Sequence, residues 1–263
     1  MAVAVTGTNG KTSVTFMAAS ALNYLKRSAG IIGTLGQGFL SSLQDSGLTT
    51  PDAGVIQSSL KSMLDAGAEM VFIEASSHGL VQGRLMGTTI QAAVFTNVTR
   101  DHLDYHGDMA SYRQAKAKLL QWEGLQCALL NLDDPWLAAL AQAAQVPEVL
   151  GFSQMNAHGA LIRAEALQFH EAGVQFELCT PAGSTTVRSA LLGQHNVSNL
   201  LAVAGLLYWY GVELDDMGAA LSNCQPPPGR LQRVAHADPP VLIDFAHTPD
   251  AVTQVLLSLR LHC

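Results

Sequence analysis

Short apolar runs alternate with longer segments of helical periodicity through the first 150 residues of the chain. The short runs predict strands, and the segments whose apolar residues recur every three or four positions predict helices. Because strands separated by helices pair in parallel through right-handed crossovers, the pattern predicts an α/β fold with a mostly parallel sheet flanked by helices. The predicted strands are Ala2–Thr6, Gly30–Gly33, Met70–Ala75, Ala92–Asn97, Cys127–Asn131 and Glu148–Phe152, and the predicted helices are Lys11–Lys26, Asp52–Ala66, Met109–Trp122 and Pro135–Gln145.

A different pattern occupies residues 159–192. Short alternating runs are separated there by Gly159, Gly173 and Gly183, which predicts antiparallel β-hairpins and hence a small antiparallel β subdomain. Helical periodicity then returns, and it predicts helices over Val197–Tyr210 and Leu214–Ser222.

Residues Pro226–Gly229 read Pro-Pro-Pro-Gly, which indicates a stiff linker. We place a domain boundary there, so that residues 1–225 form one α/β domain and residues 226–263 begin a second. In the second part, Val241–Phe245 predicts a strand and Pro249–Leu259 a helix. Such a strand is normally central in a parallel sheet. Because it lacks neighbours in this chain, we expect an unpaired edge that promotes association.

Composition narrows the class of protein. With 263 residues, 48% of them apolar, the chain can bury a sizeable core. Its net charge of −7 argues against a nucleic-acid or membrane-surface binder. We also expect a monomer. The apolar stretches are too short to span a bilayer and the N-terminus lacks a charged n-region, so we expect a cytoplasmic protein without a signal peptide. Four widely spaced cysteines indicate reduced thiols, namely Cys127, Cys179, Cys224 and Cys263.

Residues 6–12 read Thr-Gly-Thr-Asn-Gly-Lys-Thr, between the first predicted strand and the first predicted helix. Glycines let backbone N–H groups turn toward an anion, and the helix adds its positive end. Lys11 can reach the terminal phosphates of a nucleotide, and the Thr12 hydroxyl can ligate Mg²⁺. The strict pattern has one more glycine at the start of the loop, so this is a variant that uses Gly7 and Gly10. A plain glycine turn before a helix is the alternative.

Polar side chains also follow later strands, at the carboxyl ends where ligands of open α/β sheets gather. Glu74 ends one strand, and its carboxylate could hold Mg²⁺, which prefers oxygen ligands. The alternative is an exposed glutamate at a strand end. The segment Thr96–Gly107 is dense in histidine, which can ligate a metal, and in aspartate, which can orient a ligand. The residues concerned are Asp101, His102, Asp104 and His106. The alternative is that these four side chains are solvated or cap a helix.

Other positions stay ambiguous when the residues are considered alone. Lys116 lies on a predicted helix, and a free ammonium cannot bind Mg²⁺. The segment Thr49–Asp52 can simply cap a helix, with Pro at an early helical position. Arg84 could pair with a substrate carboxylate. Asn196 and Asn199 lie one helical turn apart and could be caps or could contact an adenine edge.

Together these segments resemble the Mur ligase family, whose members form amide bonds in peptidoglycan precursors at the expense of ATP. The nucleotide loop is shared by Mur and folylpolyglutamate ligases, whereas the Thr-Thr-Pro-Asp-Ala and Ser-Ser-His-Gly-Leu-Val-Gln blocks are much more specific. The resemblance runs in order over almost the whole chain. The segments that carry it are Gly7–Ser13, Thr49–Ala53, Glu74–Arg84, Phe95–Gly107, Tyr112–Lys116, His195–Leu200, Gly229–Val234 and Asp244–Asp250.

The resemblance implies roles for individual residues. One Mg²⁺ would be held by Thr12 and Glu74, and a second by Glu74, His102 and Lys116. Lys116 would be carbamylated to N6-carboxylysine, because a CO₂ adduct turns a cation into an anionic oxygen ligand. The implied ATP-binding residues are Gly7, Thr8, Asn9, Gly10, Lys11, Thr12, Ser13, Asn196, Asn199 and Asp244. The implied substrate-binding residues are Thr49, Thr50, Ser76, Gln82 and Arg84. The implied catalytic residues are Lys11, Glu74, His102, Lys116 and Arg233.

The implied reaction is ATP-dependent and ADP-forming, and it extends UDP-N-acetylmuramoyl-L-alanyl-D-glutamate by one amino acid. A substrate carboxylate attacks the γ-phosphate of ATP, and the amine of diaminopimelate or lysine then displaces phosphate from the acyl phosphate. The sequence leaves the choice of amino acid open. Two other classes also stay open. One is a ligase like folylpolyglutamate synthase, which the Ser-Ser-His-Gly-Leu-Val-Gln block disfavours, and the other is a non-catalytic nucleotide-binding module.

Two departures from the family pattern affect these expectations. Leu48 stands where the resemblance leads us to expect asparagine, so one substrate hydrogen bond of the family is not expected here. Residues 1–225 would form the central ATP-binding domain, and residues 226–263 the linker and the truncated start of the C-terminal domain. We therefore expect the domains that hold UDP and the incoming amino acid to be missing, and the chain to bind Mg-ATP weakly and to ligate poorly.

Overall fold

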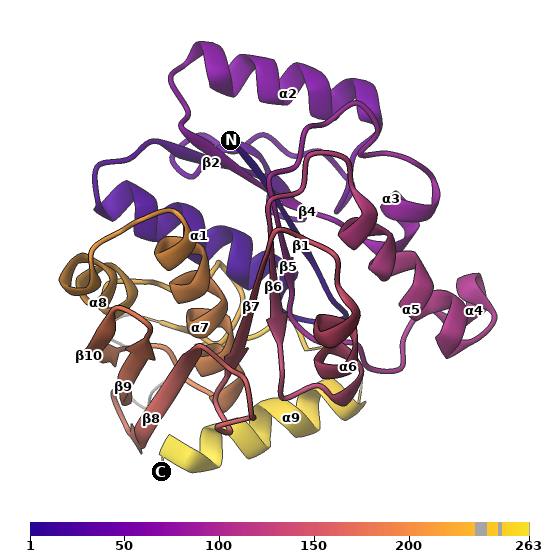
Figure 1. The fold of residues 1–263 in the computed structure, drawn as a ribbon. Helices are drawn as coiled ribbons and strands as arrows, with labels where there is room; N and C mark the ends of the chain where they lie inside the picture. The colour runs from indigo at the N-terminus through magenta and orange to yellow at the C-terminus, as the bar shows by residue number, and fades with distance from the viewer. Residues whose placement is uncertain (235–240, 247–248, 263) are drawn as a thin grey trace.

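The structure is a computed structural model that describes residues 1–234, 241–246 and 249–262. Its main sheet, over those residues, has the strand order β10-β9-β8-β7-β6-β5-β1-β4-β2-β3 (Figure 1). The strands are β1 (Ala2–Thr6), β2 (Ala29–Gly33), β3 (Gly36–Phe39), β4 (Met70–Glu74), β5 (Ala92–Phe95), β6 (Cys127–Asn131), β7 (Glu148–Ser153), β8 (Ile162–His170), β9 (Gly173–Thr180) and β10 (Gly183–Ser189). The order confirms the predicted α/β fold, since β2, β4, β1, β5, β6 and β7 pair in parallel.

Helices cover both faces of this sheet (Figure 1). The helices are α1 (Lys11–Tyr24), α2 (Ala53–Asp65), α3 (Ser77–Val81), α4 (Leu103–His106), α5 (Met109–Ala117), α6 (Pro135–Ala143), α7 (Gln194–Trp209), α8 (Leu214–Ser222) and α9 (Pro249–Leu259), with 3₁₀ turns η1 (Lys118–Gln121) and η2 (Arg260–His262). One core packs α1, α7 and α8 against the sheet, and a second packs α2, α5 and α6 on the opposite face. Burial on both faces explains why the central strands are continuous apolar runs.

The register of the central strands brings the functional segments to one edge of the sheet. Val5 of β1 pairs with Glu74 of β4, and Thr6 pairs with Phe95 of β5. All three strands therefore end at the same level, with the segment after β1 between the other two. This is the edge at which ligands of open α/β sheets bind.

The region 159–192 forms antiparallel hairpins, as predicted. They continue the main sheet, because β8 pairs in parallel with the end of β7 and then antiparallel with β9. Several short elements were not predicted from the pattern, among them β3, α3 and α4. The strand β3 contains two glycines and pairs with β2 and, through an isolated bridge from Gln37, with Gln44, while α3 and α4 are single turns too short to show helical periodicity.

The C-terminal segment corrects one expectation. The predicted strand Val241–Phe245 is shorter, and it is not without a neighbour, because β12 (Leu242–Ile243) pairs antiparallel with β11 (Gln232–Arg233). The segment also packs on the rest of the chain, because Leu231 is buried beside Gly193 and His262 is buried against His170 and Phe169 of β8. The helix α9 agrees with the prediction. His247 and Thr248 of the motif Asp244–Asp250, and Cys263, lie outside the described residues, and the domain boundary at Pro226 stays a prediction.

The cysteines and helices add two observations. Cys127, Cys179 and Cys224 are free thiols, and burial raises the pKa of Cys224 to about 12. Among the described residues, no helix combines the length and the apolar character that crossing a bilayer requires.

Candidate active site

The loop Gly7–Gly10 adopts a conformation that needs glycine. Gly7 has φ +151° and a Cβ there would collide with Thr96, while Gly10 has φ +87° at the position that precedes α1. The amides of Thr8 and Asn9 donate to the carbonyl and side-chain oxygens of Asn97, at 2.8 and 3.0 Å. The loop is thus fixed to the end of β5, at the positive end of α1.

Two lysines converge on the carbonyl oxygen of Gly7. Lys11 Nζ donates to it at 3.0 Å and to Thr8 O at 2.9 Å, and Lys116 Nζ donates to it at 2.8 Å. Lys116 is 1% exposed, and its Nζ lies 4.6 Å from the centre of the Tyr112 ring. Burial, and then the charge of Lys11, lower the pKa of Lys116 from 10.5 to about 6. Lys116 is therefore largely a neutral amine at neutral pH.

Glu74 is buried directly beside the phosphate loop. Its Oε2 accepts hydrogen bonds from Thr12 Oγ1 at 2.9 Å and Thr34 Oγ1 at 3.2 Å, and its Oε1 accepts from Thr34 N at 2.8 Å. Burial raises the pKa of Glu74, and these hydrogen bonds only partly oppose that shift. The carboxylate is 1% exposed, which rules out the alternative of an exposed glutamate.

The donor set around Glu74 fits a hard divalent cation. A carboxylate and the Thr12 hydroxyl present oxygen atoms at one point, at the edge of a loop suited to phosphates. No ion pair within 4.0 Å involves Glu74 among the described residues, although the charge of Lys11 acts on it from a greater distance and opposes the rise of its pKa. The residues present are thus compatible with Mg²⁺ between Thr12 and Glu74.

His102 lies at the start of α4, with φ +53°. Asp101 orients it, because Asp101 Oδ1 accepts from His102 N at 2.8 Å and Oδ2 lies 3.5 Å from His102 Nε2. His106 instead contacts Ser77 Oγ through Nε2 at 3.0 Å. Within the described residues, no group of three His, Cys, Asp or Glu side chains is placed to hold a metal ion. The second metal site, which requires a modified Lys116, stays a prediction.

The segments Thr49–Asp52 and Ser76–Arg84 lie against each other beside Glu74. Thr50 Oγ1 contacts Glu74 O at 2.7 Å and Ser76 Oγ at 2.9 Å, and it accepts from Ser76 N at 3.0 Å. Arg84 donates to Thr50 O at 2.7 Å. Thr49 contacts Thr34 through their hydroxyls at 3.0 Å, and Gln82 donates to Tyr105 at 3.3 Å. The structure therefore brings four of the predicted substrate residues to the strand end that carries Glu74, whereas the printed contact of Gln82 is with Tyr105 of α4.

Thr50→Val should destabilise the protein by about 1–3 kcal/mol, because it leaves buried partners of the hydroxyl unsatisfied. Thr50→Ser is the matched control, since serine keeps the hydroxyl, and it should lose much less. Urea unfolding of both variants measures the difference. Equal losses in the two variants would contradict the assignment of the effect to the hydroxyl.

The residues predicted to reach ATP from outside the loop lie on α7 and in the C-terminal segment. Asn196 and Asn199 are buried on α7, and Asn199 lies against the loop, because a Cβ on Gly10 would come within 2.8 Å of Asn199 Oδ1. Asp244 accepts hydrogen bonds from Leu231 N and Ala246 N. Arg233 is not brought to the loop, since its guanidinium donates to Glu171 O at 2.7 Å. Its catalytic role stays a prediction.

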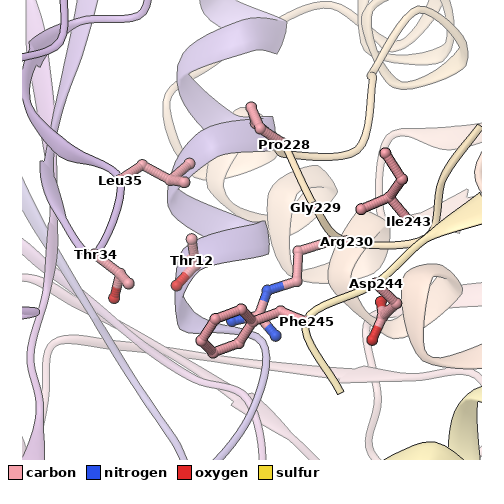
Figure 2. A pocket seen from close by; sticks show the side chains of 9 residues that line it. All are labelled: Thr12, Thr34, Leu35, Pro228, Gly229, Arg230, Ile243, Asp244 and Phe245. Atoms are coloured by element: carbon pink, nitrogen blue, oxygen red, sulfur yellow. The ribbon is translucent and has the colours of Figure 1, made fainter. Parts of the chain in front are cut away.

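A cavity of about 220 Å³ lies between the phosphate-loop side and the C-terminal segment (Figure 2). Thr12 and Thr34 line it from one side, while Arg230 and Phe245 extend from the C-terminal segment (Figure 2). The Arg230 guanidinium carbon is 5.0 Å from the centre of the Phe245 ring. Arg230 places a positive charge beside the two hydroxyls, and Asp244 adds a carboxylate to the lining, so the part of the cavity near Arg230 suits an anionic group of a ligand.

Sequence reasoning overlooked three residues here. Thr34 directly follows β2 and supplies two of the hydrogen bonds to Glu74. Tyr112 contacts Thr8 Oγ1 through its hydroxyl at 2.9 Å, and burial raises its pKa to about 12. Arg230 lines the cavity. Arg230 and Tyr112 both fall in segments that the resemblance covers, which was the available signal.

Comparison with known proteins identifies close relatives. The sequence profile of the Mur ligase middle domain matches residues 5–207. The UDP-N-acetylmuramoyl-L-alanyl-D-glutamate–2,6-diaminopimelate ligase of Ectopseudomonas mendocina is 48% identical over 261 residues, which cover 99% of this chain and 53% of that protein. The Pseudomonas aeruginosa protein of that name is 47% identical with the same coverage. A solved structure of a protein of that name is 38% identical with a TM-score of 0.89, over 99% of this chain and 54% of that one. The chain thus spans about half the length of these relatives.

Proposed function

This chain belongs to the Mur ligase family, and from that premise we propose that it is the ATP-binding part of a ligase that extends UDP-N-acetylmuramoyl-L-alanyl-D-glutamate. The reaction is the ADP-forming addition of an amino acid during synthesis of peptidoglycan precursors. The names of the relatives favour diaminopimelate over lysine as that amino acid. ATP and Mg²⁺ are used throughout the family.

One observation carries this proposal. The buried carboxylate of Glu74 accepts a hydrogen bond from the Thr12 hydroxyl of the phosphate loop, at 2.9 Å. A nucleotide triphosphate on Gly7–Thr12 would therefore lie directly beside a buried negative charge. Such an arrangement is unfavourable without a cation, and a site that binds Mg-ATP supplies one.

The residues of the chain would act by positioning and by charge stabilisation. Lys11 would exchange its contacts with the loop carbonyls for the terminal phosphates of ATP. The substrate carboxylate would attack the γ-phosphorus, ADP would leave, and the amine would then attack the acyl carbon and release phosphate. Arg230 lies nearer to this point than Arg233, which would reach ATP only after its contact with Glu171 breaks. No covalent enzyme nucleophile is required.

Metal ions would be held by Thr12 and Glu74 at one site, and by Glu74, His102 and carboxylated Lys116 at a second. When bound, Mg²⁺ neutralises the charge of the phosphates and of the attacking carboxylate. The low pKa of Lys116 supports the modification, because only the neutral amine reacts with CO₂. The substrate dipeptide would lie along Thr49, Thr50, Ser76, Gln82 and Arg84, where Arg84 offers a guanidinium to a carboxylate.

Phosphate release tests the proposal. The assay contains ATP, Mg²⁺, UDP-muramoyl-dipeptide and either diaminopimelate or lysine. It is run on this chain and on a chain extended at both ends to the length of the relatives. We expect release from the extended chain that depends on diaminopimelate, and little from this chain alone. ATP binding by the extended chain without amine-dependent release would instead indicate a non-catalytic nucleotide-binding module.

A further inference from the structure

His262, in the 3₁₀ turn η2, is a buried histidine with two defined hydrogen bonds. It is 7% exposed, and its ring meets the Phe169 ring edge-on at 5.4 Å. Gly193 N donates to His262 Nε2 at 2.8 Å, and His262 Nδ1 lies 2.8 Å from the carbonyl oxygen of His170. A carbonyl oxygen can only accept and a backbone amide can only donate. Both hydrogen bonds form together only in the neutral tautomer that carries its proton on Nδ1.

The partner Gly193 is the residue directly before α7. It has φ +88°, and a Cβ there would lie 2.7 Å from the His195 ring and 3.2 Å from Leu231 Cδ1. Leu231 belongs to the C-terminal segment and is 3% exposed. The C-terminal segment therefore contacts the start of α7 twice, through the Leu231 side chain and through the His262 imidazole.

A series of side-chain amides continues from this point to the phosphate loop. Asn196 Nδ2 donates to Leu192 O at 2.8 Å, and Asn199 Nδ2 donates to Asn196 Oδ1 at 2.9 Å. Asn199 Oδ1 in turn lies against Gly10, as described above. The backbone at residues 192 and 193 thus sets the position of both asparagines relative to the loop.

We propose that His262 is a positioning residue for nucleotide binding. Its imidazole bridges the end of β8 and the first turn of α7, and this contact holds Asn196 and Asn199 in place beside Gly10. The inference rests on the proposed function, because it assumes that these asparagines contact the nucleotide. It assigns a role in the nucleotide site to a side chain that is remote from the phosphates.

The contact itself can be tested without nucleotide. In ¹⁵N-histidine NMR spectra of the full chain, His262 should show a protonated Nδ1 and an unprotonated Nε2. The Gly193 amide should exchange with solvent about three- to tenfold faster in His262→Ala, which corresponds to one hydrogen bond. His170→Ala is the matched control, because it keeps the main-chain carbonyl that accepts from His262, and it should leave Gly193 exchange unchanged. A protonated Nε2, or unchanged exchange in His262→Ala, would overturn the proposal.

The role in positioning is tested by affinity for a fluorescent, non-hydrolysable ATP analogue with Mg²⁺. The side-chain oxygen of glutamine can accept from Gly193 N, whereas the shorter asparagine can reach only the His170 carbonyl. We therefore expect His262→Gln to bind like the unmodified chain, and His262→Asn and His262→Ala to bind about three- to tenfold more weakly. Faster Gly193 exchange with unchanged affinity would overturn the positioning role. Failure of the unmodified chain to bind the analogue would instead contradict the proposed function, and with it this role, while Gly193 exchange would still decide the contact.

Discussion

Glu74→Gln should lower ligase turnover about 10²- to 10³-fold in a full-length relative that carries the equivalent substitution, the size of loss typical when a charge-stabilising group is removed. In this chain, the same substitution should remove the Mg²⁺ dependence of nucleotide binding. The physical reason is the loss of the anionic oxygen that meets Thr12 at the loop. Nucleotide titrations with and without Mg²⁺ measure the effect in this chain, and phosphate release measures it in the relative.

The substitution should not cost stability. Glutamine keeps an oxygen for Thr34 N, and the hydroxyls of Thr12 and Thr34 can rotate to accept from its amide. Because burial raises the pKa of Glu74, the folded state binds the proton more tightly than the unfolded state does, so ionisation destabilises the fold as pH rises through that pKa. Glu74→Gln should therefore unfold at an equal or higher urea concentration at neutral pH. Glu123→Gln on the surface is the control. Full Mg²⁺ dependence in Glu74→Gln would contradict the assignment.

Lys116→Met should also abolish turnover in the full-length context, because it removes the amine that would carry CO₂. In that modification the amine nitrogen bonds to the carbon of CO₂ and releases a proton, which leaves an anionic carbamate. Carbon-13 NMR spectra in labelled bicarbonate should show a carbamate signal from this chain that is absent from Lys116→Met. Lys118→Met, an exposed lysine on the following turn, should keep the signal. A carbamate signal that survives in Lys116→Met would contradict the assignment.

The same substitution changes the dependence of stability on pH. The pKa of unmodified Lys116 is about 6 in the folded state, whereas its usual value, taken for the unfolded state, is 10.5. Between these two pH values the unfolded state therefore binds more protons than the folded state. The free energy of unfolding should therefore rise with pH across this window, by up to about 1.4 kcal/mol per pH unit from this group. Lys116→Met should flatten that slope, and Lys118→Met should not. Urea unfolding at several pH values in CO₂-free buffer measures it.

The sequence predicted most accurately the elements whose ends are marked by a local change of residue type. The strands Ala2–Thr6 and Cys127–Asn131 have the predicted ends, because each is an apolar run that stops at polar or glycine residues. The strand β3 has no such run. Its sequence does not predict a strand, and it is extended because it pairs with β2. The turn α4 begins at His102 with positive φ, which only its tertiary surroundings fix.

The residues of the site also divide into those that local sequence could place and those that only tertiary packing places. Thr12 and Glu74 could be placed together because Glu74 ends β4 and Thr12 follows the adjacent parallel strand β1, and the register of those strands sets their distance. The position of Asn199 against Gly10 depends on how α7 packs across the sheet, which no local pattern encodes. The position of Arg230 at the cavity has a similar cause, since the fold of the C-terminal segment decides which arginine lines the cavity.

The most direct measurement is a crystal structure of the chain soaked with a non-hydrolysable ATP analogue and Mn²⁺, whose anomalous signal identifies the metal. We expect the phosphates on the amides of Gly7–Thr12 and a metal peak in contact with both the Thr12 hydroxyl and the Glu74 carboxylate. Phosphates bound elsewhere, or a nucleotide on the loop whose metal contacts neither side chain, would contradict the account.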